Sequence, residues 1–263
     1  MSEPERARAG SLTIVGTGIR AGLQTTRETR LCIERADKVL YLLAEVAPTA
    51  WIRSLNPSTK SLAPLYQPGR PHAEVYEEIV NTIVSEVRRG LDVCVATYGH
   101  PGVFDQTSHE SVRRAEAEGF RARILPGISA EDCLYADLRF DPGEHGCQSF
   151  DATDFLVLGR RPDVSVPLIL WQVSVIGSPL TTGSVNRSGL RVLAERLGEL
   201  YGPDHEVVVY EATPFPVGSP MIVRCAVREL ADAKVTGLSS LFVPPSAKLA
   251  PDEAMMARLG LTR

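Results

Sequence analysis

The sequence has few aromatic residues and no long hydrophobic run. Phe, Trp and Tyr make up only 6% of its 263 residues. No apolar stretch approaches the roughly 20 residues that a membrane-spanning helix needs, so we expect no membrane association. Residues 1–10 are polar and charged, which excludes a secretory signal and predicts a disordered lead-in. The sequence therefore predicts a cytoplasmic protein.

Basic residues and cysteines are also scarce. The 28 Lys and Arg residues are outnumbered by 32 Asp and Glu, and they are scattered along the chain. This distribution is untypical of a nucleic-acid groove. The five cysteines are odd in number and widely spaced, and no Cys/His cluster has the spacing of metal ligands. We expect reduced thiols, no bound metal and no nucleic-acid partner.

What the sequence does contain is a pair of loops about two dozen residues apart. The first, Tyr98–Phe104, follows an apolar run at 91–97, and the second, Pro126–Asp132, follows one at 121–125. A helical pattern comes after each loop. Loops that follow parallel strands lie at the carboxyl edge of the sheet, where α/β proteins bind small molecules. The two loops therefore predict a binding site.

Predicted strands and helices alternate along the first half of the sequence. Strands are predicted at 11–15, 39–43, 91–97 and 121–125, and helices at 25–36, 51–55, 72–89 and 108–118. Such alternation predicts a parallel sheet. The helix at 72–89 has the clearest pattern, with a branched apolar residue every fourth position.

The second half has a different pattern. Strands are predicted at 154–158, 167–172, 206–210 and 238–243, helices at 188–201 and 252–261, and long loops at 141–148 and 176–186. We predict an N-terminal α/β domain over 11–125, a C-terminal α/β domain over 126–248 and a helical tail over 249–263.

Individual motifs are weaker. Gly16 and Gly18 follow the first strand, but the next glycine, Gly22, is one place too late for a dinucleotide fingerprint. His100, in a Gly/Pro-rich turn at a strand end, is favoured as a ligand contact over a turn histidine bonded to backbone. Tyr66, Arg70 and Tyr76 surround a proline-rich loop, and from the residues alone ordinary surface and helix-face roles are favoured for them.

Longer stretches show a family resemblance. The segments YGHPGVF, LPGISAEDCLYADL, DPGEHGCQSF, LILWQV and FVPPSAKL, within Leu12–Lys248, resemble the borosin peptide α-N-methyltransferases. These enzymes form a branch of the tetrapyrrole methylase superfamily. The resemblance implies a two-domain α/β fold with a parallel-sheet N-terminal domain, a mixed-sheet C-terminal domain and the cofactor cleft between them.

The same resemblance implies S-adenosylmethionine (SAM) as the cofactor. The residues that match the cofactor-binding positions are Tyr98, His100, Val103, Phe104, Ser129, Ala130, Gln172, Ala212, Thr213, Ser239 and Ser240. Thr213 departs from the family pattern, in which alanine is expected.

Tyr66 and Tyr76 match the catalytic tyrosines of the family. An arginine is expected four residues before the second tyrosine, but His72 occupies that position, and we assign the role to Arg70 nearby. The resemblance implies methylation of backbone amides by a homodimer. Because the chain ends without a flexible apolar peptide, we expect the substrate to be a separate precursor peptide.

Two alternatives stay open. A tetrapyrrole C-methyltransferase would need several Arg or Lys residues for the carboxylates of a macrocycle, and residues 62–89 offer few. A peptide-binding homologue with impaired catalysis is the second alternative, because the expected arginine is displaced.

Overall fold

The computed structural model describes residues 9–43, 46–215 and 217–261, so most of the predicted disordered lead-in lies outside the described residues. The chain divides into two compact units. The first contains the chain up to Phe140 together with Ser178–Gly183 and Glu211–Met221. The second contains Asp141–Gly177, Ser184–Tyr210 and the chain from Ile222.

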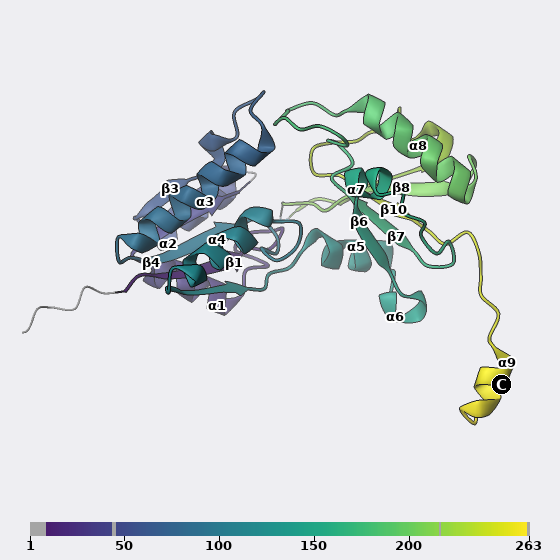
Figure 1. Ribbon diagram of the computed structural model, residues 1–263, viewed down its shortest axis with the longest axis horizontal. Coiled ribbons are helices and arrows are strands. Elements are labelled where there is room, and N and C mark those ends of the chain that lie inside the picture. Colours follow the sequence, from purple (N-terminus) through teal and green to yellow (C-terminus); the bar gives the residue numbers. More distant parts are fainter. Residues whose placement is uncertain (1–8, 44–45, 216, 262–263) are drawn as a thin grey trace, which may run out of the picture. The chain divides into compact units, whose positions relative to one another are not determined.

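The first unit is built on a parallel sheet, as predicted (Figure 1). Its strands are β1 (Ser11–Gly16), β2 (Lys38–Leu42), β3 (Thr59–Ser61), β4 (Asp92–Thr97) and β5 (Arg121–Leu125), in the order β3-β2-β4-β1-β5. The helices are α1 (Arg27–Arg35), α2 (Val46–Leu55), α3 (His72–Arg88), α4 (Gln106–Ala117) and α5 (Ala130–Leu138), with a 3-10 turn, η1, at Ala63–Leu65.

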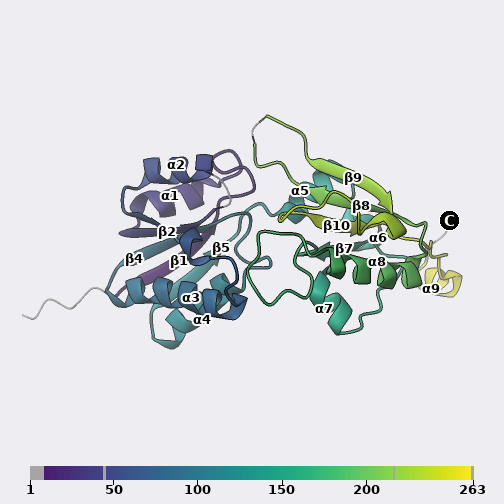
Figure 2. The ribbon, with the colours of Figure 1, turned by 90° about the horizontal axis from the view of Figure 1, so that it is seen from above.

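Helices cover both faces of this sheet, with α1 and α2 on one side and α3 and α4 on the other (Figure 2). Successive strand residues point to opposite faces. Leu12 and Ile14 thus pack in one buried cluster with α3, whereas Val15 packs in a second cluster with Ile33 of α1 and Ile52 of α2. Burial on both faces explains the nearly continuous apolar runs of these strands.

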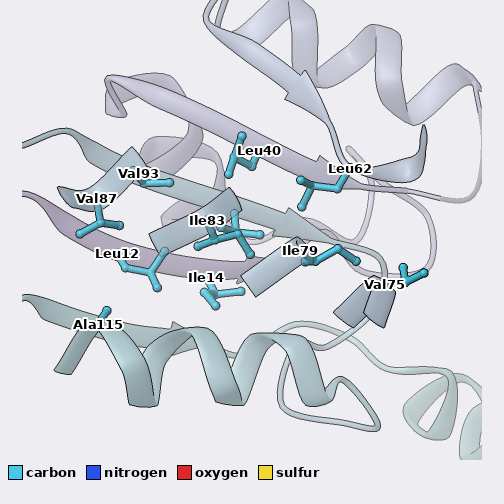
Figure 3. Close-up of a cluster of buried hydrophobic side chains, with 11 residues drawn as sticks. Leu12, Ile14, Leu40, Leu62, Val75, Ile79, Ile83, Val87, Val93 and Ala115 are labelled. Carbon is cyan, nitrogen blue, oxygen red and sulfur yellow. The ribbon is translucent and has the colours of Figure 1, made fainter. Parts of the chain in front are cut away.

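Helix α3 contributes the longest apolar stripe to this core. Val75, Ile79, Ile83 and Val87 are all buried in the cluster shown in Figure 3. Tyr66, in the loop before the helix, packs against the same cluster. The helix therefore gives a rigid support to the residues of its first turns.

The sheet of the second unit is mixed, with the order β6-β7-β10-β8-β9. Its strands are β6 (Gln148–Asp151), β7 (Leu168–Trp171), β8 (Glu206–Glu211), β9 (Met221–Ala226) and β10 (Ser240–Val243). Strand β6 is parallel to β7, whereas β10 is antiparallel to both β7 and β8. The remaining elements are α6 (Pro142–His145), α7 (Ala152–Val157), α8 (Arg187–Tyr201), η2 (Val227–Glu229) and α9 (Glu253–Arg258).

The strand predicted at 154–158 is wrong. These residues belong mainly to α7, which packs against β6, β7 and α8. The Asp151 carboxylate accepts hydrogen bonds from the N–H groups of Thr153 and Asp154, at 2.7 and 3.0 Å, and so begins a helix. The strand lies just before this cap, at Gln148–Asp151, where the sequence predicts the end of a loop.

Candidate functional site

Three loops meet at the carboxyl edge of the parallel sheet because β1 lies between β4 and β5. Gly18 and Gly99 exchange backbone hydrogen bonds of 3.2 and 3.1 Å across two of these loops. A Cβ atom at Gly16 would lie 2.3 Å from the Gly99 carbonyl oxygen, and one at Gly127 would lie 2.5 Å from the same atom. Only glycine permits this approach. The structure thus brings both predicted loops together with the turn after β1.

The loop after β4 has a fixed and partly strained backbone. His100 Nδ1 accepts a 2.8 Å hydrogen bond from the Gly102 N–H, so the neutral ring carries its proton on Nε2. Val103 N–H donates to the His100 carbonyl. Phe104 follows with φ of 51°, a left-handed conformation that is rare for a bulky residue, and its side chain is 46% exposed. Tyr98 comes directly after β4, so the predicted residues of this loop all lie at one sheet edge.

The loop after β5 leads into α5 through a capping box. The Ser129 N–H donates to the Asp132 carboxylate at 2.7 Å, and the Asp132 N–H donates back to Ser129 Oγ at 3.2 Å. Ser129 is buried, and Ala130 is the first residue of the helix. The positive end of the α5 dipole therefore lies at this loop.

The other predicted cofactor residues lie in both units. Ala212 is buried and Thr213 Oγ1 accepts from the Phe215 N–H at 3.3 Å, both within the first unit. In the second unit, Gln172 is exposed just after β7, and Ser239 and Ser240 are buried at the start of β10.

Backbone strain is concentrated at these predicted positions. Among the described residues other than glycine, positive φ occurs at Phe104, Gln172 (58°) and Arg139. Arg139 ends helix α5, where a left-handed residue is common. The other two follow strands, and strained residues of this kind gather at ligand-binding sites.

Tyr66 and Tyr76 form an aromatic cluster at the start of α3. Their ring centroids are 6.4 Å apart in an edge-on arrangement. The His72 ring lies 5.7 Å from the Tyr76 ring. His72 Nδ1 is buried and has no hydrogen-bond partner among the described residues. A buried polar atom without a partner needs an explanation, and a ligand atom that binds there would supply one.

The surroundings of Tyr66 favour its protonated form. Burial raises the pKa of the Tyr66 hydroxyl well above its usual range, and the neighbouring Tyr76 and Asp105 raise it further. Asp105 was not among the predicted site residues. It caps α4 by accepting hydrogen bonds from the Ser108 N–H and hydroxyl. Its position just before a helical pattern is a cap signal, but nothing in the sequence indicates its proximity to Tyr66.

Arg70 has a different environment from the tyrosines. Its Nη1 donates to Glu78 Oε2 at 2.8 Å and to the Leu65 carbonyl at 3.3 Å. Arg70 also lines an open depression along α3 with Glu74, Glu77, Glu78, Asn81, Thr82 and Ser85. The guanidinium is therefore partly neutralised by a carboxylate, and its catalytic role stays a prediction.

None of the helices in the described residues is long and apolar enough to cross a membrane. No group of three or more His, Cys, Asp or Glu side chains in that part of the chain could hold a metal ion.

The described chain is similar to known methyltransferases over nearly its whole length. It is 41% identical to the "Methyltransferase/ribosomally synthesized cyclic peptide gymnopeptides precursor" of Gymnopus fusipes, over 99% of this chain and 63% of that protein. It is 38% identical to the corresponding omphalotin A precursor of Omphalotus olearius, over 99% of this chain and 64% of that protein. The chain thus spans less than two thirds of the length of these relatives.

Solved structures share the fold at lower identity. Cobalt precorrin-4 methyltransferase matches with a TM-score of 0.64 and 18% identity, over 92% of this chain and 98% of that one. The methyltransferase CobJ matches with a TM-score of 0.62 and 18% identity, over 92% and 97% of the two chains. The expected fold, a parallel-sheet and a mixed-sheet α/β unit, is confirmed. The family model for tetrapyrrole (corrin/porphyrin) methylases covers residues 11–231, and the chain belongs to this family.

Proposed function

We propose that this protein transfers methyl groups from SAM to backbone amide nitrogens of a ribosomally made precursor peptide. The observation that carries the proposal is the pair of tyrosine rings at the start of α3, beside the unpartnered buried nitrogen of His72. The names of the relatives, which join a methyltransferase to a cyclic-peptide precursor, support the same reaction.

The residues at the sheet edge suit SAM. Tyr98 and Phe104 offer aromatic surface for an adenine. The cofactor supplies an electrophilic methyl group, and the residues identified by the resemblance are proposed as its contacts.

The chain's own residues must activate a poor nucleophile, because the lone pair of an amide nitrogen is delocalised into the carbonyl. We assign the base role to Tyr76, whose phenolate would accept the amide proton as the nitrogen attacks the methyl group. Tyr66 keeps its proton, since burial raises its pKa, and so suits donation to the carbonyl oxygen. Arg70 would supply a second donor to that oxygen by exchanging Glu78 for the peptide.

The form of the substrate is a separate question. The sequence predicts that the substrate is a separate precursor peptide. This stays a prediction, because each relative is named as a methyltransferase and a precursor together. The homodimer is likewise proposed from the resemblance.

C-methylation of a tetrapyrrole is the alternative that the family and the solved structures suggest. A macrocycle with several carboxylates would need several Arg or Lys residues at the site, and residues 62–89 contain only Arg70, Arg88 and Arg89. The scarcity of basic residues there therefore favours the peptide.

The test is intact-mass analysis of a candidate precursor peptide incubated with protein and SAM. We expect mass steps of one methyl group, and Tyr76→Phe should slow them by on the order of a hundredfold or more. SAM affinity, measured by calorimetry, should persist in this variant. Tyr201→Phe is the matched control, because the Tyr201 hydroxyl is buried without a partner in the described chain. Methylation of uroporphyrinogen but of no peptide would overturn the proposal.

A further inference from the structure

A short segment far along the chain lies directly on the loop between the two tyrosines. We call residues Pro179–Thr181 the strap. Pro71 and Leu180 form an isolated antiparallel bridge between loop and strap. Both belong to the first unit, although the residues on either side of Ser178–Gly183 belong to the second.

The strap receives the loop's backbone donors. Pro68 and Pro71 have no N–H group, so residues 68–72 offer only three. The Gly69 N–H donates to the Thr181 carbonyl at 2.9 Å, and the His72 N–H donates to the Pro179 carbonyl at 3.0 Å. The Arg70 N–H donates to Thr181 Oγ1 at 3.2 Å. All three donors therefore bind the strap, and the Arg70 N–H also lies 3.4 Å from the Gln67 carbonyl oxygen.

Thr181 makes the largest share of these contacts. Its N–H donates to the Arg70 carbonyl at 2.8 Å. Its hydroxyl, while accepting from the Arg70 N–H, faces the carbonyl oxygens of Gln67 and Arg70 at 2.5 and 3.1 Å. The Thr181 residue is buried, with 6% of its surface exposed. Its backbone and hydroxyl thus fix the loop from Gln67 to Arg70.

We propose that Thr181 is a positioning residue for the methyl-transfer site. It acts through the loop, whose backbone sets where the Arg70 guanidinium and the His72 ring lie relative to Tyr66 and Tyr76. This inference rests on the proposed function and deepens it. The hydrogen bonds of the Thr181 hydroxyl are made with backbone atoms of the loop, so it acts on the catalytic side chains through that backbone.

A positioning role and a purely stabilising role predict different kinetic results. Displacement of a catalytic group by about 1 Å can cost on the order of a hundredfold in rate. Loss of the hydroxyl should therefore lower kcat while leaving SAM binding intact, since the proposed SAM contacts lie on other loops. A purely stabilising role would lower the melting temperature and leave kcat of the folded protein unchanged.

The experiment compares the full chain with Thr181→Val, Thr181→Ser and Ile33→Val. Valine keeps the shape of threonine without the hydroxyl, and serine keeps the hydroxyl. Ile33→Val destabilises the second buried cluster, which does not contain the residues of the loop. We expect Thr181→Val to lower kcat for the peptide by about ten- to a hundredfold. Serine should restore most of the rate, and Ile33→Val should not lower it.

Hydrogen exchange provides a second readout that does not require activity. The amides of Gly69, Arg70 and His72 should exchange faster in Thr181→Val than in the wild type, and Ile33→Val should leave them protected. Wild-type kcat and unchanged exchange in Thr181→Val would overturn the inference. A wild-type protein that methylates no peptide would instead overturn the proposed function, and the exchange data would still test the strap.

Discussion

Arg70 and His72, near the start of α3, are both candidates for the role of the catalytic arginine that the family resemblance implies. Arg70 has the expected chemistry, but its guanidinium is paired with Glu78. His72 has the expected position, and its ring lies against Tyr76 with a buried, unpartnered Nδ1. A guanidinium donates through a planar fork that lysine cannot reproduce, whereas an imidazole donates through one nitrogen at a time.

We expect Arg70→Lys to lower the methylation rate by about tenfold or more, because the lysine ammonium lacks that fork. Kinetics of Arg70→Lys, Arg70→Ala and His72→Ala on one peptide provide the measurement. Glu78→Gln is the control, since it frees the Arg70 guanidinium without removing it. If His72→Ala is the damaging change and both Arg70 variants are silent, His72 holds the role and our assignment of Arg70 fails.

Single residues show where the sequence is sufficient and where it is not. The glycines at 16, 99 and 127 stand out in the sequence. The structure explains Gly16 and Gly127 by close backbone contact and Gly99 by its positive φ of 71°. The left-handed backbone of Phe104 and Gln172 carries no composition signal, since neither residue favours that conformation. The contact between Thr181 and Arg70 could not be predicted from the sequence, because no local pattern connects residues so far apart in the chain.

Helices α3 and α4 pack against each other and are joined by charged side chains. Arg114 of α4 donates to both Glu77 of α3 and Glu110 of its own helix. Hydrogen bonds from Arg113 and Arg114 lower the pKa of Glu110 to about 2, from an ordinary value of 4.5. A lowered folded-state pKa means that the ionised carboxylate stabilises the fold above pH 4.5, and this contribution is lost as the pH falls towards 2.

We therefore expect Glu110→Gln to lower the melting temperature at pH 7, by a few degrees at most because the ion pairs are exposed. The difference from the wild type should shrink as the pH falls below 4.5, and calorimetric melts between pH 7 and 3 measure it. Glu116→Gln, on the same helix, is the control. A difference that stays constant down to pH 3 would contradict the assigned cause.

How well each element could be predicted depends on its length and pattern. The long periodic stripe of α3 and the doubly buried strands of the first unit leave little ambiguity. The four apolar residues at 155–158 fit a strand or a buried helix equally, and only the Asp151 cap decides between them. Strands β3 and β9 escape prediction, because one has three residues and the other is partly exposed along its length.

For the whole molecule, relatives supply what the fold alone does not. The solved structures that share the architecture of this chain at 18% identity include an enzyme named for a tetrapyrrole substrate. The relatives at 38–41% identity are named for peptides instead. A fold of this kind therefore supports several methyl acceptors, and we propose that the loops and the start of α3 select among them.

The proposed peptide methyltransferase is also expected to assemble as a homodimer, which is a property of the whole molecule. We expect a homodimer, with a light-scattering mass near twice the 28.6 kDa of one chain at every practical dilution. An obligate dimer interface buries about 2,000–5,000 Å², which prevents dissociation on dilution. Native mass spectrometry with a precursor peptide should then show one peptide per subunit. A peptide whose backbone amides already carry methyl groups is the control, because it should bind without gaining mass. A monomer that gains no peptide but methylates a tetrapyrrole would contradict both the assembly and the substrate class.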